Sequence, residues 1–336
     1  MRKVVGLLSL LWVLCGSLSA QVSYSSAITN LVKVTYNASS TATVVVASNL
    51  QSYVTATVSG GAVSIVQNST VGAATCGEII YLLGGSSANG SFYMEGSYKA
   101  TIELDNLTLT NPQGPAFNIQ NGKRIELKLL EGTVNTLKDG TSSATDAWKA
   151  ALYCKGHLEL KGRGTLNVYG NYAHAIYSKE YMSIKNCTIN VCSAVKDALH
   201  CREYFLMESG KVSLRGFASD GIECNIDGTL STGETPNHED EDSGNIYILG
   251  GSLTIDMSHS SGNSLKADGT QTINPDAMVN VSTNVDLVAQ TEGSIEVYNL
   301  LGTYIGRFDT MQGINSLPRG IYVIKNSNLV KKVNIL

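Results

Sequence analysis

The chain has 336 residues, of which 28 are acidic and 24 basic, so its formal net charge is −4. This length accommodates one large domain or two smaller ones. The acidic balance argues against nucleic acid as a partner, because a phosphate-binding surface needs an excess of basic residues.

Residues 1–20 have the organisation of a secretory signal peptide. Arg2 and Lys3 precede an apolar run over 4–14, and Leu18-Ser19-Ala20 is typical of a cleavage site. The apolar run is too short to span a bilayer and no other long apolar segment follows, so we expect no membrane span. Removal of Arg2 and Lys3 changes the net charge from −4 to −6. We therefore expect a secreted protein, soluble or surface-attached, whose mature chain begins near Gln21.

Residues 21–99 contain strand-like segments rich in Thr, Ser and Val, such as VKVTYN and TATVVVA. They lack the regular spacing of the following region. We interpret them as irregular first coils of a repeat or as its N-terminal cap, because the end units of a repeat array are commonly atypical.

Three short apolar segments recur in fixed order over residues 100–275. One of these segments occurs at Leu166, again at Ile189 and again at Val212, with a spacing of 23 residues each time. The next step, to Leu253, is 41 residues, which is the same period with an insertion of 18. Each segment alternates apolar and polar residues, as half-buried strands do, and the helical period of 3.6 is absent.

These features predict an all-β fold, a right-handed parallel β-helix with three short strands per coil of about 23 residues. Stacked coils bury the inward aliphatic side chains in one continuous core. In the stretch ALHCRE (198–203), Leu199 repeats the aliphatic position, so alternation points Cys201 inward and His200 and Arg202 outward. Cys201 and Cys224 then lie on adjacent coils within disulfide reach, and we expect them to be buried free thiols.

Two outward columns run beside this inward column. One is a column of rings, formed by Tyr153, Tyr177 and His200. The other is a column of cations, formed by Lys155, Lys179 and Arg202. One interpretation is a solvated face whose charges are compensated by Glu180 and Glu203. The other is a carbohydrate-binding strip, in which rings stack on sugars and cations hold uronate carboxylates.

A column of turn residues precedes the second strand of each coil and contains Asp197 and Asp220. Such side chains commonly satisfy backbone N–H groups in turns. Alternatively, stacked carboxylates bind calcium, and the acidic insertion supplies further oxygen ligands in Asp240 and Asp242. A calcium-dependent lyase would add Lys179 or Arg202 as base, but a solvated lysine and an arginine hold their protons. We assign no catalytic residue.

Residues 276–336 have no 23-residue period and contain hairpin-like strands separated by LLGT, LPRG and NSN, which predict a small β-sandwich. The segments VYNLLG (297–302), LPRGIY (317–322) and KKV (331–333) resemble the type A C-terminal sorting domain of the type IX secretion system of Bacteroidota. The resemblance implies export across the outer membrane by that machinery.

The repeat region resembles bacterial carbohydrate-binding parallel β-helix proteins, which are related in shape to pectate lyases. The resemblance rests on segments such as GHLELKGRGTLNVYGN (156–171) and HEDEDSGNIYILGGSLTI (238–255). It implies binding of cellulose or polygalacturonate, with calcium in the fold. We expect a monomeric polysaccharide-binding protein; the alternatives are a calcium-dependent pectate lyase and a non-catalytic surface adhesin.

Overall fold

The computed structural model describes residues 21–143, 147–228, 241–282, 295–299, 301–308, 314, 317–318, 320–326 and 329–335. The expected signal peptide, residues 1–20, lies outside this range. Apart from a 3-10 turn, η1 (Ser48–Leu50), the elements with described bounds are β-strands. Within the described part of the chain no helix is long and apolar enough to cross a bilayer.

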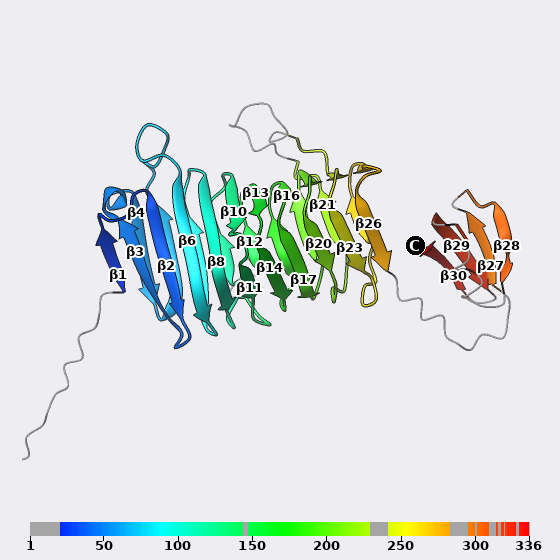
Figure 1. Cartoon of the computed structure of the whole chain (residues 1–336), viewed down its shortest axis with the longest axis horizontal. Helices are drawn as coiled ribbons and strands as arrows, with labels where there is room; N and C mark the ends of the chain where they lie inside the picture. The colour runs from blue at the N-terminus through cyan, green and yellow to red at the C-terminus, as the bar shows by residue number, and fades with distance from the viewer. Residues whose placement is uncertain are drawn as a thin grey trace, which may run out of the picture.

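The repeat region forms three parallel stacks, and each coil contributes one strand to each stack (Figure 1). The first stack contains β10 (Ile125–Leu129), β13 (Leu158–Gly162), β16 (Met182–Lys185), β19 (Tyr204–Met207), β22 (Asn245–Ile248) and β25 (Gln271–Ile273). The second contains β11 (Val134–Lys138), β14 (Thr165–Gly170), β17 (Thr188–Ala194), β20 (Lys211–Leu214), β23 (Ser252–Asp256) and β26 (Met278–Ser282). The expected β-helix-like arrangement of three strands per coil is therefore confirmed.

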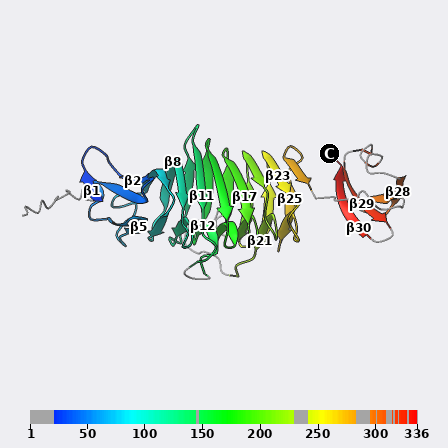
Figure 2. The same cartoon turned by 90° about the horizontal axis from the view of Figure 1, so that it is seen from below.

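The third stack carries most of the residues singled out in the sequence, and we call it the site sheet. Figure 2 shows it as the layer of β12 and β21, apart from the layer of β11, β17 and β23. Its repeat strands are β9 (Phe117–Ile119), β12 (Ala150–Cys154), β15 (His174–Ser178), β18 (Leu199–Arg202), β21 (Ile222–Asn225) and β24 (Leu265–Ala267).

The strand register reproduces the periodicity of the sequence. Leu166 pairs with Ile189, Ile189 with Val212, and Val212 with Leu253. The 18-residue insertion leaves the coil between β21 and β22, so it does not disturb the pairing on either side. Residues one coil apart in sequence are thus neighbours in space.

Parallel stacking begins earlier than residue 100. The preceding strands are β1 (Val22–Ser25), β2 (Leu31–Asn37), β3 (Thr41–Ala47), β4 (Val54–Ser59), β5 (Gly61–Gln67), β6 (Ile79–Ser87), β7 (Gly90–Glu95) and the long β8 (Ala100–Thr110). β5, β7 and β9 pair in parallel, as do β2, β6 and β8, whereas β2–β3 and β4–β5 are antiparallel. This region therefore contains first coils together with two hairpins.

The interior of the coils is apolar, as stacking requires. On the site sheet, Leu199 and Cys201 point inward and are fully buried. Cys201 and Cys224 are register partners and both are free thiols, so the expectation of buried free thiols is confirmed. Burial raises the pKa of Cys201 well above its ordinary value, which keeps this thiol protonated and unreactive.

The C-terminal region is a separate antiparallel sheet with the strand order β28 (Tyr304–Phe308), β27 (Ile295–Asn299), β29 (Gly320–Asn326), β30 (Leu329–Ile335). Ile295, Val297, Ile314 and Ile324 form its own small core. Since β26 still pairs with β23, the solenoid extends to Ser282, into the segment expected to begin the C-terminal domain. Within its described residues this region has one sheet, and the second layer of the expected sandwich stays a prediction.

Candidate binding face and metal centre

A single column of registered residues runs along the outer face of the site sheet. From β7 to β24 it contains Tyr93, Asn118, Tyr153, Tyr177, His200, Glu223 and Lys266. The column thus changes from aromatic to ionic side chains along the solenoid. The prediction that Tyr153, Tyr177 and His200 lie one above another is confirmed.

The three rings stack closely. The centroids of Tyr153 and Tyr177 are 5.5 Å apart with an interplanar angle of 1°, and those of Tyr177 and His200 are 4.8 Å apart at 17°. However, Tyr153 and Tyr177 are only 5% and 3% exposed, since Trp148 packs beside them. The open ring faces expected from the sequence are therefore not present. These tyrosines form a small apolar cluster outside the main core, and their contact with sugars stays a prediction.

The cation column divides into a paired end and an unpaired end. Arg202 forms an ion pair with Asp227. Lys155 is exposed and Lys179 half-buried, and neither has a carboxylate within 4.0 Å among the described residues. The two lysines therefore place positive charge on adjacent coils, about 4.8 Å apart along the stack, without a carboxylate partner in the described part of the chain.

The expected compensation by Glu180 and Glu203 is absent because both side chains turn to His157. Nε2 of His157 lies 3.0 Å from Oε2 of Glu180 and 3.3 Å from Oε2 of Glu203. Glu203 also accepts the backbone N–H of Tyr181 at 3.2 Å. Burial raises the pKa of Glu180 to about 7. This buried histidine–glutamate group removes the two carboxylates from the lysine column.

Sequence reasoning missed this group and the rings beside it. His157 stacks on Tyr181 with centroids 4.3 Å apart, and Tyr181 stacks on Tyr204 at 4.8 Å. These three rings lie three positions after the inward-pointing residues Cys154, Ser178 and Cys201, respectively. The coil period that revealed the first ring column would therefore have found this second one.

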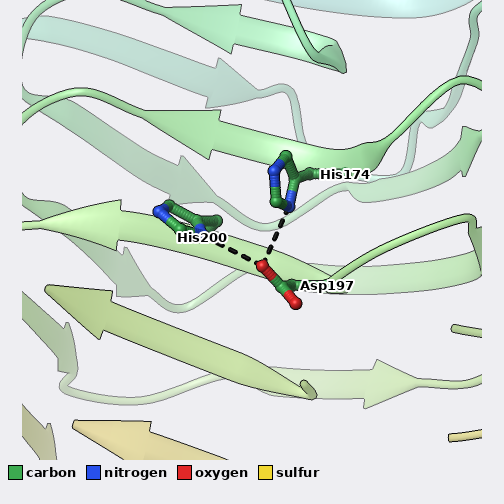
Figure 3. A group of neighbouring side chains, drawn as sticks. All are labelled: His174, Asp197 and His200. Atoms are coloured by element: carbon green, nitrogen blue, oxygen red, sulfur yellow. Dashed lines mark hydrogen bonds and ion pairs between the residues drawn. The ribbon is translucent and has the colours of Figure 1, made fainter. Parts of the chain in front are cut away.

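Residues of the turn column and of the outer column together form a cluster of two histidines and two carboxylates, which we call the histidine–carboxylate cluster: His174, Asp197, His200 and Glu223. Nδ1 of His174 lies 3.0 Å, and Nδ1 of His200 2.9 Å, from Oδ2 of Asp197. Nδ1 of His200 is also 3.3 Å from Oε2 of Glu223. Figure 3 shows both rings turned toward the Asp197 carboxylate from neighbouring strands.

The pKa shifts in this cluster follow from burial and mutual contact. Burial opposes ionisation of Asp197, but contacts from His174 and His200 hold the pKa of its carboxyl far below the usual range. Burial would lower the pKa of His200, but Asp197 and Glu223 raise it above the ordinary value. For His174 burial dominates and lowers the pKa. Near neutral pH the cluster therefore contains ionised Asp197 and neutral His174.

The same carboxylates also satisfy backbone donors in the turns. Oδ1 of Asp197 accepts the N–H of Asp220 at 3.0 Å, and Oδ1 of Asp220 accepts the N–H of Asn263 at 2.6 Å. The interpretation of this column as a set of turn-capping side chains is thus confirmed. Each cap ties one coil to the next.

Of the predicted calcium ligands, Asp197 and Asp220 lie together, whereas Asp242 lies apart from them. Asp240 lies outside the described residues. The oxygens of Asp242 accept the N–H groups of Asp227 and Gly228, each at 2.7 Å. Asp220 precedes β21, whereas Asp227, which Asp242 contacts, follows that strand. Asp220 and Asp227 are therefore separated by roughly 20 Å of extended chain.

The remaining carboxylates do not fit calcium as they are arranged. Asp197, Asp220 and Glu223 offer ligand atoms within 4.8 Å of one another. Calcium takes six to eight oxygens, whereas the ammonium of Lys266 lies 2.6 Å from Oε1 of Glu223 and 3.4 Å from Oδ2 of Asp220. A side-chain cation thus occupies the position where a metal would bridge them. Calcium elsewhere in the chain stays a prediction.

An open hollow of about 140 Å³ lies at the aromatic end of the column on the outer face of the site sheet, beside Tyr93 and Asn118. Its lining combines the rings of Tyr93 and Trp148 with the amides of Asn111, Gln113 and Asn118. Rings beside hydrogen-bonding side chains are the usual composition of a small-molecule site. Sequence reasoning missed this hollow, because its residues come from three separate coils and a loop.

Comparison with solved structures shows the same fold in a distant protein. A polysaccharide lyase-like protein from C. thermocellum, solved as a gadolinium derivative, matches with a TM-score of 0.55 and 18% sequence identity. The match covers 74% of this chain and 99% of that chain. No curated protein matches the sequence.

Comparison with protein families gives a match over most of the coils. The family model described as "Carbohydrate-binding domain-containing protein" matches residues 59–300, which is more than half of the chain. The matched residues begin at the β4–β5 hairpin and include all the coils that build the site sheet from β5 to β24. The chain belongs to the family of carbohydrate-binding domain-containing proteins.

Proposed function

We propose that this protein binds acidic polysaccharide of the plant cell wall, with polygalacturonate as the expected ligand, along the outer face of the site sheet. The observation that carries the proposal is a pair of lysines on adjacent coils, Lys155 and Lys179, which have no carboxylate within 4.0 Å among the described residues. A uronate polymer lying along the solenoid axis would place successive carboxylates beside them, because a coil rise is comparable to the length of one sugar unit.

The hollow next to these coils extends the proposed path. Tyr93 and Trp148 would cover the apolar face of a sugar ring, while Asn111, Gln113 and Asn118 would bond to its hydroxyl groups. A neutral glucan such as cellulose would rely on this hollow alone. Tyr153 and Tyr177 lie beneath the path and, because both are largely buried, contribute chiefly by supporting it.

Binding is favoured over lyase chemistry by the state of the available bases. Arg202 is paired with Asp227 and stays charged. Lys266 is the lysine beside Asp220, and its hydrogen bond to Glu223 raises its pKa. It therefore holds its proton near neutral pH, whereas a lyase base must be unprotonated to remove a proton from the sugar.

Affinity electrophoresis in gels containing polygalacturonate tests the proposal. We expect Lys155→Ala with Lys179→Ala to weaken binding at least about tenfold, since each substitution removes one charge-assisted contact with the polymer. The matched control is Lys33→Ala with Lys211→Ala, which removes the same charge from exposed positions outside the site sheet. The control should bind within about twofold of wild type, and neither pair should change the thermal midpoint of unfolding.

Equal weakening in both double variants would contradict the strip and indicate non-specific attraction. Unchanged binding in the Lys155/Lys179 variant would place the ligand elsewhere or favour the adhesin interpretation. Unsaturated product absorbing in the ultraviolet would instead indicate a lyase. On cellulose, Trp148→Ala should reduce pull-down while the lysine variants retain it.

We further propose that the coils are right-handed, as the resemblance of the repeat region to pectate-lyase-shaped β-helix proteins implies.

We also propose that the C-terminal sheet is a type IX sorting domain and that the protein reaches the cell surface or the medium. The proposal rests on VYNLLG and LPRGIY; Leu300 and Arg319 of these segments lie outside the described residues. β27 contains the first half of VYNLLG and β29 the second half of LPRGIY, and the two strands pair directly. Deletion of residues 295–336 should retain the protein in the periplasm by cell fractionation, and normal export of the truncated chain would refute it.

A further inference from the structure

The histidine–carboxylate cluster has a donor set unlike that of the predicted calcium site. It presents two imidazole nitrogens and two carboxylate oxygens, and the ligand atoms of His174, Asp197 and His200 lie within 4.8 Å of one another. Calcium prefers oxygen donors alone, whereas imidazole with carboxylate suits late first-row divalent metals. The chemistry of the donors therefore selects a different metal from the one that the acidic residues suggested.

Three of the donors, from His174, Asp197 and His200, form a compact group, and Glu223 adjoins it through His200. Oδ2 of Asp197 is 3.0 Å from Nδ1 of His174 and 2.9 Å from Nδ1 of His200, which is 3.3 Å from Oε2 of Glu223. In a tetrahedral zinc site with metal–ligand distances of about 2.1 Å, neighbouring donors are about 3.4 Å apart. Small outward shifts of these side chains would suffice to admit an ion.

The carboxylates are already oriented by outer contacts. Oδ1 of Asp197 is held by the backbone N–H of Asp220, and Oε1 of Glu223 is held by Lys266 at 2.6 Å. In each case the second oxygen is left facing the imidazoles. Metal sites commonly have such outer hydrogen bonds, which fix the orientation of the ligands.

An independent observation at His174 points to a missing ligand. This side chain is 5% exposed, and its Nδ1, although 3.0 Å from Asp197, has no partner in hydrogen-bonding geometry among the described residues. A buried polar atom without a hydrogen bond is costly. An ion between Nδ1 of His174 and Oδ2 of Asp197 would satisfy it.

We propose that His174, Asp197, His200 and Glu223 bind a late first-row divalent metal, with Zn²⁺ as the expected ion and Ca²⁺ excluded. The ligands come from β15, from β18 and the turn before it, and from β21, so the ion links three successive coils. It acts as a structural cross-link beside the glycan path, and its existence does not depend on carbohydrate binding.

Titration of the metal-stripped full chain with Co²⁺ tests the site, because tetrahedral cobalt with nitrogen and oxygen ligands absorbs visibly. We expect saturable absorption at one equivalent, displacement by Zn²⁺, and no displacement by a large excess of Ca²⁺. Zn²⁺ should also raise the thermal midpoint of unfolding, since it binds the folded chain alone.

His174→Ala and His200→Ala should each weaken Co²⁺ and Zn²⁺ binding at least about 100-fold. His259→Ala is the matched control, since this exposed histidine contacts Ser258 and lies outside the cluster. No cobalt absorption in the wild type, displacement by Ca²⁺, or equal loss in the control would overturn the proposal. If the His→Ala variants do not fold, as judged by circular dichroism, the wild-type spectrum and the Ca²⁺ competition still decide it.

Discussion

The inner wall and the outer face of the site sheet use the same strands in different ways. On the inner wall, Leu152, Ile176, Leu199 and Ile222 repeat an aliphatic side chain in four successive coils, and all are fully buried. On the outer face, the next residue of each strand is Tyr153, Tyr177, His200 or Glu223. The shared backbone register thus imposes uniformity only where side chains must fill the core.

This difference separates residues that hold the coils together from residues that act on ligands. Stacked inner residues have neighbours above, below and across the core, so their shape is constrained. An outer residue has neighbours only in its own sheet and can change chemical type from coil to coil. The proposed glycan path and the proposed metal site therefore lie side by side on one face without a change in fold.

The largest effect should come from the inner wall. Leu199→Ala should lower the free energy of unfolding by about 4 kcal/mol, because Ile176 and Ile222 are fixed in register on either side and cannot fill the cavity. Leu265→Ala, in the same column but only half-buried, is the control and should cost clearly less. Equal costs in urea denaturation would show that the inner column does not act as a continuous stack.

A smaller effect is expected from the outer ionic cluster. Asp197→Asn should lower the free energy of unfolding by about 3 kcal/mol, since the amide still accepts the Asp220 N–H but no longer compensates His200. Asp256→Asn is the control, because Asp256 accepts the N–H of Ser258 and has no ion pair among the described residues. A loss no greater than in the control would mean that Asp197 acts only as a turn cap.

The smallest effect is a dependence on pH at Glu180. Its pKa is raised by burial to about 7 from an ordinary value of 4.5, so the folded chain binds this proton more tightly than the unfolded chain. This contribution to stability is complete at low pH and is lost as the pH rises from 4.5 to 7. Glu180→Gln should therefore become more stable relative to wild type over that range.

The comparison requires unfolding curves of both proteins at several pH values in one buffer series. The difference between the two proteins isolates Glu180, because the other titrating groups are common to both. A difference that does not vary with pH would mean that His157 holds the Glu180 carboxyl ionised in the folded protein.

Much of the fold could be predicted from particular residues. The spacing of Leu166, Ile189 and Val212 predicted the coil period, and strand alternation placed Leu199 and Cys201 inside and His200 outside. The coil period and the alternation are both local properties of the chain, since side chains alternate along a strand with a period of two and successive coils have the same number of residues. The stacking of Tyr153, Tyr177 and His200 followed from the same coil period and alternation.

The site was predicted less completely. The residues of the turn column were found, but the partnership of His174 and Glu223 with Asp197 was not, and four acidic residues were grouped as calcium ligands instead. Glu180 and Glu203 were expected beside the lysines, yet they turn to His157. Side-chain direction at a corner depends on the loops and rings packed there, which the repeat does not encode.

The sequence by itself determined the all-β class, the coil length, the inward columns and the identity of the residues stacked on the outer face. Only the tertiary structure decided that Trp148 covers the tyrosines, that Lys155 and Lys179 have no carboxylate partner in the described part of the chain, and that two histidines meet one buried carboxylate. The physical reason is range: alternation and period are set between neighbouring residues, whereas burial and charge pairing depend on side chains contributed by other coils and by the loops between them.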